Sequence, residues 1–193
     1  MSEETSNLPP VEESSDTKTQ AQADYKTGQD FLVKGDTTLA AHAFHNALLG
    51  FQECNDLHGV ANAVDKLADI CMDRREYAQA LKHIDTAYQI CEKEEDQQST
   101  ISLRHKIAAA KTGMEKYDEA LETYFDLIDH YQGSLNPKGT VETMEKVAEL
   151  YLLKNNPAGA ADAYRTIASI HANFKHKKVA QEFNDKADAL DKK

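Results

Sequence analysis

Apolar positions recur along this chain with a helical period, and the pattern itself returns after forty residues. Two stretches within residues 61–100 show the spacing of one helical face. They are Val64, Leu67, Ala68 and Cys71, followed by Ala80, Ile84, Ala87 and Tyr88. The polar segment 72–77 separates the two stretches. This block therefore predicts two helices joined by a short turn.

The same block occurs four times without a gap, as residues 21–60, 61–100, 101–140 and 141–176. Small residues fill two columns of the alignment. The first column is Gly28, Ala68, Ala108 and Ala148, and the second is Ala40, Ala80, Ala120 and Ala160. Small side chains let paired helices approach closely. The period therefore predicts an array of helical hairpins.

The two ends of the chain differ from the repeats. Residues 1–20 are dominated by Glu, Ser, Thr, Pro and Asp, and they carry too little apolar area to offset chain entropy. We expect a disordered acidic tail there. At the other end, residues 177–193 carry one apolar stripe of Ala180, Phe183, Ala187 and Leu190. This pattern predicts a single helix that caps the last repeat.

The first block resembles the tetratricopeptide repeat. The residues that carry the resemblance are Gly28, Phe31, Ala40, Phe44 and Ala47. The usual unit has about 34 residues, so a unit of forty is similar to a longer branch of the family. The resemblance implies an all-α, right-handed superhelical solenoid of four helix-turn-helix repeats plus a C-terminal capping helix. The departures from the pattern are Lys111 in an apolar column, and Leu127 and Ile167 in a small one.

Charge and composition narrow the functions to consider. The 193 residues carry a formal net charge of -11, which disfavours a nucleic-acid or anionic-membrane surface. No run approaches the ~18 apolar residues of a membrane helix, and the first ten residues are not typical of a signal peptide. Three widely spaced cysteines suit reduced thiols. These features predict a cytoplasmic protein that does not insert into membranes.

The resemblance implies a concave groove, lined by the first helix of each hairpin, that binds a peptide or helix of a partner protein. Helical spacing selects the residues of this groove. The candidates are Tyr25, Lys26, Gln29, Asp65, Lys66, Asp69, Asp73, His105, Lys106, Glu142, Glu145, Lys146 and Glu149. Every repeat contributes one lysine to this set, while repeats two and four supply all of its acidic residues.

Charge pairs are expected within this set, because residues three or four apart meet on a helix. Asp69 follows Lys66 by three residues, and Glu142 and Glu149 flank Lys146. The remaining carboxylates favour an amphipathic ligand with basic residues. A solvated face with internal ion pairs is the alternative for any single residue. Some members of the family that this chain resembles bind a C-terminal carboxylate with a clamp of Lys, Asn and Arg on adjacent first helices. Such a clamp is disfavoured here, because the first repeat has Tyr25 and Gln29 in place of a Lys and Asn pair and the face carries no arginine.

Other functions find less support in the sequence. No nucleophile is paired with a base and no phosphate loop is present, so we expect no enzyme activity and no cofactor. His42 and His45 lie three residues apart, but no third metal ligand is evident. The prediction is a non-catalytic scaffold or adaptor. The alternatives are a peptide-responsive regulator, a secretion or assembly chaperone, and self-association through an end repeat.

Overall fold

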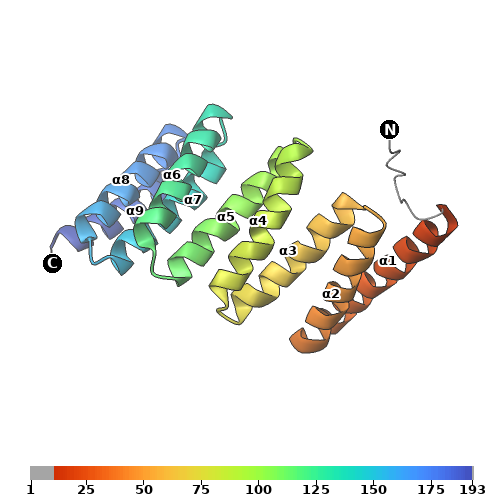
Figure 1. Cartoon of the computed structure of the whole chain (residues 1–193). Coiled ribbons are helices and arrows are strands. Elements are labelled where there is room, and N and C mark those ends of the chain that lie inside the picture. Colours follow the sequence, from red (N-terminus) through yellow and green to blue (C-terminus); the bar gives the residue numbers. More distant parts are fainter. Residues whose placement is uncertain (1–10, 193) are drawn as a thin grey trace, which may run out of the picture. The chain divides into compact units, whose positions relative to one another are not determined.

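The computed structural model describes residues 11–192, and this part of the chain consists of nine helices joined by short loops (Figure 1). Their bounds are α1 (Val11–Val33), α2 (Thr37–Glu53), α3 (Leu57–Asp73), α4 (Tyr77–Lys93), α5 (Gln97–Gly113), α6 (Tyr117–Gly133), α7 (Pro137–Leu153), α8 (Pro157–Asn173) and α9 (Lys177–Asp191). Helices α2 to α8 have 17 residues each. From α2 onward a helix begins every 20 residues, which is half the period seen in the sequence.

All eight loops have three residues, and their middle residue adopts a left-handed backbone. Gly35 has a φ of 78°. The seven others are Asn55, Arg75, Glu95, Glu115, Leu135, Asn155 and Lys175, with φ between 52° and 62°. In the first loop the Asp36 N–H donates to the Phe31 carbonyl and the Gly35 N–H donates to the Leu32 carbonyl. This pattern closes the preceding helix.

The third loop residue starts the next helix in five of these loops. Asp36, Asp56, Asp96, Asn136 and Asn156 accept a hydrogen bond from the backbone N–H three residues later. Such a cap satisfies one of the amide groups that a helix start leaves without an intrahelical partner. One loop design therefore ends a helix, turns the chain and begins the next helix within three residues.

The small columns predicted from the sequence lie in the core. The seven alanines of these two columns are all fully buried, namely Ala40, Ala68, Ala80, Ala108, Ala120, Ala148 and Ala160. Leu127 and Ile167, which depart from the family pattern, are also fully buried. Lys111 keeps its stem in its apolar column, and its Nζ donates to Thr123 Oγ1 at 3.2 Å. A long side chain can bury its stem and still reach a polar partner.

Helix α1 begins at Val11, inside the segment expected to be a disordered tail, so residues 11–20 differ from that expectation. Contacts beyond the segment's own composition account for the difference. Lys18 Nζ lies 2.8 Å from Asp56 Oδ2. One turn later, Ala21 is buried against Gly50, where an added Cβ would lie 2.8 Å from the Ala21 Cβ. Residues 1–10 lie outside the described residues.

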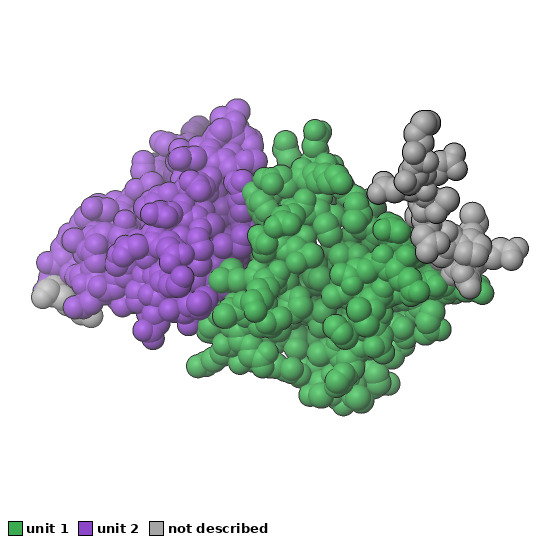
Figure 2. All heavy atoms as spheres, viewed as in Figure 1, with its two compact units in different colours: residues 1–103 green, residues 104–193 purple. Residues whose placement is uncertain are grey.

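The chain divides into two compact units, the first ending at Leu103 and the second beginning at Arg104 (Figure 2). The boundary falls within α5. In the first unit α1 packs on α2, α2 on α3, and α3 on α4. In the second unit α6 packs on α7, α7 on α8, and α8 on α9. The predicted all-α array of helical hairpins with a capping helix is confirmed.

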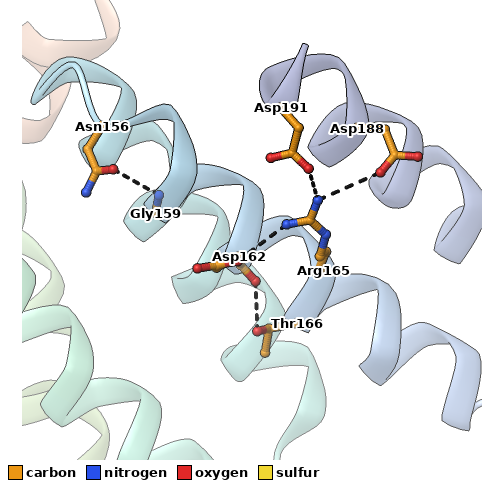
Figure 3. Close-up of polar contacts among 7 residues, drawn as sticks. All are labelled: Asn156, Gly159, Asp162, Arg165, Thr166, Asp188 and Asp191. Atoms are coloured by element: carbon orange, nitrogen blue, oxygen red, sulfur yellow. Dashed lines mark hydrogen bonds and ion pairs between the residues drawn. The ribbon is translucent and has the colours of Figure 1, made fainter. Parts of the chain in front are cut away.

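Arg165 ties the capping helix α9 to α8 (Figure 3). Its guanidinium pairs with Asp162 on its own helix and with Asp188 and Asp191 on α9. Beneath these charges, Phe183 is buried and packs on the core that contains Ile167. Apolar burial and an ion-pair network thus hold α9 at the end of the array.

Candidate functional site

In the first unit, the predicted groove residues of α3 gather around one lysine. Lys66 Nζ lies 3.7 Å from Asp65 Oδ2 and 3.6 Å from Asp69 Oδ2. Tyr25 of α1 is half-buried, and its ring packs edge-on against Phe44 at 5.2 Å between centroids. Burial raises the pKa of Tyr25, and the charges of Asp65 and Asp69 raise it further. Two carboxylates and a phenol therefore share this face.

Asp65 also lines a small hollow of about 120 Å³ in the first unit. Asn62 of α3 and Ser99 and Ser102 of α5 supply its other polar side chains. The buried residue Cys91 also lines the hollow, and burial raises the pKa of its thiol. A carboxylate, an amide and two hydroxyls offer hydrogen-bond partners for a polar ligand group.

In the second unit, His105 of α5 bonds to a tyrosine that the sequence did not single out. Its Nε2 lies 3.0 Å from the hydroxyl of Tyr131 on α6. Burial lowers the pKa of His105, and the charge of Glu142 on α7 opposes that shift. Glu142 also raises the pKa of Tyr131, after the larger effect of burial. Tyr131 thus bonds to one predicted groove residue, His105, and the charge of another, Glu142, acts on both rings.

Three further groove candidates, Glu145, Lys146 and Glu149, lie on α7, and the two glutamates act electrostatically on tyrosines of the second helices. Lys146 Nζ lies 2.9 Å from Glu149 Oε2. Burial raises the pKa of Tyr164, and the charges of Glu149 and Glu145 raise it further. The pKa of Tyr124 is raised by burial and then by Glu149. Both tyrosines belong to second helices, and their phenols share the field of the α7 carboxylates.

Other candidates stay apart from these clusters. Lys26 and Gln29 on α1 and Asp73 at the end of α3 are exposed and make no hydrogen bond or ion pair within residues 11–192. Lys106 is half-buried on α5 and interacts with another part of the protein.

The predicted pairs Lys66–Asp69 and Lys146–Glu149 are confirmed. The expected pair between Glu142 and Lys146 does not form, because Glu142 pairs with Lys138 at 3.8 Å.

The described part of the chain shows neither a metal-binding cluster nor an activated cysteine. No group of three or more His, Cys, Asp and Glu side chains there could hold a metal ion. Cys54, Cys71 and Cys91 are free thiols. Burial raises the pKa of Cys71 as it does that of Cys91, which disfavours the reactive thiolate. Within the same residues, no helix has the length and apolar character required to cross a membrane.

Comparison with known proteins identifies the repeats. Residues 59–132 match the model of the tetratricopeptide repeat family. This segment begins at the start of the second hairpin and ends within α6 of the third. The match shows tetratricopeptide repeats in this segment, which confirms the resemblance, and the helical hairpins recur every forty residues along the described part of the chain. Comparison with curated protein sequences found no significant match.

Solved structures with similar folds agree with this assignment. One contains TPR-like repeats from a putative kinesin light chain of Podosopora anserina, with a TM-score of 0.58 and 13% identity, covering 94% of this chain and 97% of the other. Another is BtubC (BKLC) from P. vanneervenii, with a TM-score of 0.56 and 12% identity, covering 90% of each chain. At these identities the likeness describes the fold alone.

Proposed function

We propose that this protein is a non-catalytic adaptor that binds a peptide or helix of a partner protein on the first-helix faces of its hairpins. One observation carries the proposal. In each unit the charges of two carboxylates on a first helix act on a tyrosine, and in the first unit Asp65 and Asp69 raise the pKa of Tyr25, after the larger effect of burial. In the second unit Glu149 and Glu145 act in the same way on the pKa of Tyr164.

The chemistry of these pairs favours a cationic side chain in the ligand. Lysine or arginine can pair with a carboxylate and also lie against an aromatic ring. Exposed apolar side chains extend the faces, since Leu152 and Leu153 lie at the end of α7 and Val33 at the end of α1. A basic amphipathic segment would complement both features. The proposal includes a cytoplasmic location, which the three free thiols support.

Charge reversal tests this assignment. The variant Asp65→Lys, Asp69→Lys, Glu145→Lys and Glu149→Lys is compared with wild type in affinity capture from native lysate at low and moderate salt. A matched control reverses four exposed carboxylates of second helices, namely Asp85, Glu92, Glu122 and Asp126. We expect the first variant to lose a partner that the control retains. Equal retention by both variants would refute the assignment of the face.

Separate reversal of the two pairs assigns the ligand to a unit. The variant Asp65→Lys and Asp69→Lys changes only the first unit, and Glu145→Lys and Glu149→Lys changes only the second. If one pair alone abolishes capture, the ligand needs that face and not the other. Circular dichroism and thermal unfolding of each variant show whether lost capture has a folding cause.

A further inference from the structure

A hollow of about 320 Å³ lies in the second unit, where the loop 134–136 meets the loop 174–176. Its wall is largely apolar and includes Tyr131, Leu135, Pro137, Ile170 and Phe174. A second hollow of about 340 Å³ adjoins it and shares Pro137, Ile170 and Phe174. Neither hollow contains the carboxylates of the proposed first-helix faces, apart from Glu142 at the edge of the second.

Leu135 departs from the loop design of the rest of the chain. It is the middle residue of its loop, with a φ of 52°, and its side chain is 88% exposed. The equivalent positions of the other loops carry Gly35, Asn55, Arg75, Glu95, Glu115, Asn155 and Lys175. A left-handed backbone disfavours a bulky side chain, and folding gains little from one that stays exposed. Leu135 therefore stands in a position where the fold itself favours glycine or a polar residue.

Phe174 is a second exposed apolar side chain at the same hollow. It is the first residue of its loop and is 54% exposed. Its ring stacks on His176 at 6.4 Å between centroids, and the Nδ1 atoms of His176 and His171 lie 3.4 Å apart. His171 in turn stacks on Phe183 of the core. These contacts orient Phe174 at the rim rather than bury it.

The surroundings of the hollow are basic, although the chain as a whole carries a net charge of -11. Lys138 lines the adjoining hollow and pairs with Glu142. Lys175, Lys177 and Lys178 follow Phe174 directly and are exposed, with no carboxylate among residues 174–178. The segments 134–142 and 174–178, which supply most of the lining, carry four lysines and one carboxylate, so the rim complements a negatively charged ligand.

We propose that this hollow is a second docking site, which takes an acidic peptide segment of a partner protein through one bulky apolar side chain. The apolar side chain inserts between Leu135 and Phe174, and the flanking carboxylates face the lysines of the rim. The site goes beyond the proposed function, because its ligand has the opposite charge from that expected on the first-helix faces. An adaptor with both sites could hold a basic and an acidic segment at once.

The test uses fluorescein-labelled peptides and the full chain, with binding measured by fluorescence anisotropy. The probe is Glu-Glu-Asp-Leu-Phe-Asp-Glu-Glu, and two control peptides replace Leu-Phe by Ser-Ser or every acid by lysine. We expect both controls to bind about tenfold more weakly or worse, because one loses the buried apolar group and the other the charge complementarity. Equal binding of all three peptides would overturn the proposal.

Variants of the protein locate the probe. Leu135→Gly suits the left-handed backbone and preserves the loop, and Phe174→Ser removes the second rim side chain. We expect each to weaken the probe about tenfold. The control Leu49→Ser removes an exposed apolar side chain of a second helix in the first unit, 52% exposed, and should leave affinity unchanged. Undiminished binding by both rim variants would overturn the assignment.

Three further outcomes separate this site from other occupants. Loss of probe binding in the four-site first-helix variant would move the probe to those faces and overturn the second site. A concentration-dependent dimer in sedimentation, abolished by Leu135→Gly, would make the occupant a second copy of the chain. Tenfold tighter probe binding after deletion of residues 1–10 would make it the chain's own N-terminal segment. The proposal is supported if the four-site variant still binds the probe, the protein sediments as a monomer, and deletion of residues 1–10 leaves the probe affinity unchanged.

Discussion

A Cβ atom at Gly28 would lie 2.8 Å from Cε1 of Phe44, so the smallest residue in its column faces an aromatic ring on the second helix of its hairpin. Phe44 is fully buried, and Tyr25 packs on its ring. The second hairpin has Ala68 and Ile84 in the equivalent positions, both fully buried. The first and second hairpins thus match a smaller residue with a larger partner, and this compensation preserves close packing.

This relationship predicts the outcome of a double-mutant cycle. Gly28→Ala gains helix propensity of about 1 kcal/mol, but overpacking against Phe44 costs about 1–3 kcal/mol. We expect a net loss of stability of about 1 kcal/mol for the single variant. Adding Phe44→Ile recreates the pair of the second hairpin and should recover part of that loss. Urea unfolding of the four proteins gives the coupling energy.

Gly133→Ala is the control for this cycle. A Cβ atom at Gly133 would meet no atom within 4 Å, so the substitution tests helix propensity without crowding. Purely additive effects of Gly28→Ala and Phe44→Ile would show that the two side chains do not compete for one space.

The left-handed loop positions predict opposite effects of glycine and alanine. Gly35 has a φ of 78° and open space around it, so Gly35→Ala should cost about 1 kcal/mol through the backbone alone. Leu135→Gly relieves the same strain and should leave the melting temperature unchanged or raise it by roughly 2–4 °C. Differential scanning calorimetry compares the two variants. A fall in melting temperature for Leu135→Gly would mean that Leu135 supports the fold after all.

Asp56 predicts an acid-dependent contribution to stability. The hydrogen bond from Lys18 holds the pKa of Asp56 below its ordinary value, and the bond from the Gly59 N–H acts in the same direction. Because the folded pKa is lowered, the carboxylate stabilises the fold at pH values above its unfolded pKa of about 3.9. That stabilisation is lost as pH falls through the lowered folded value. Asp56→Asn keeps a capping side chain but removes the charge.

We therefore expect Asp56→Asn to be less stable than wild type at neutral pH, with the difference shrinking under acid conditions. Denaturant unfolding at several pH values measures it. Asp36→Asn is the matched control, because Asp36 caps α2 by accepting the equivalent hydrogen bond from the Leu39 N–H. A difference that stays constant with pH would assign the effect to the cap rather than to the ion pair.

His105 predicts a second pH-dependent contribution, at higher pH. Burial lowers its pKa, so the folded protein disfavours the imidazolium. The neutral ring favours the folded state at pH values above its unfolded pKa of about 6.5. This contribution to the free energy of unfolding is lost as pH falls toward the lowered folded pKa. In an NMR titration, the His105 midpoint should lie below 6.5. Glu142→Gln should lower it further, because the glutamate charge opposes the shift; a rise would contradict this account.

The sequence predicted the hairpins well because their signal is periodic. The alanine columns at Ala68 and Ala80 repeat in every later block, and the same positions are buried in the structure. The boundaries of the helices were harder to predict. Most loops lack glycine, and residues such as Arg75 or Glu115 give no sign that they adopt a left-handed backbone. The helix start at Val11 depends on contacts with later helices, which local composition does not encode.

The candidate site could be predicted only in part. Helical spacing identified Lys66–Asp69 and Lys146–Glu149, which depend on one helix each. The bond between His105 and Tyr131 joins two helices, so no local pattern indicated it. Leu135 and Phe174 did carry a signal in the sequence. They are apolar at loop positions where most of the other loops are polar, and an alignment at the 20-residue spacing of the helices would have revealed them.

The 20-residue spacing of the helices restricts how an array of this kind can grow or shrink. A duplication or deletion of forty residues exchanges whole hairpins, so Ala68 would still find an Ile84-like partner at the new junction. A duplication or deletion of twenty residues would preserve the length of the loops and of the 17-residue helices, but it would exchange the roles of first and second helices. Leu48 or Tyr88 would then stand where close packing requires Gly28 or Ala68. Loop geometry allows both steps, but side-chain size makes the hairpin the smallest interchangeable module.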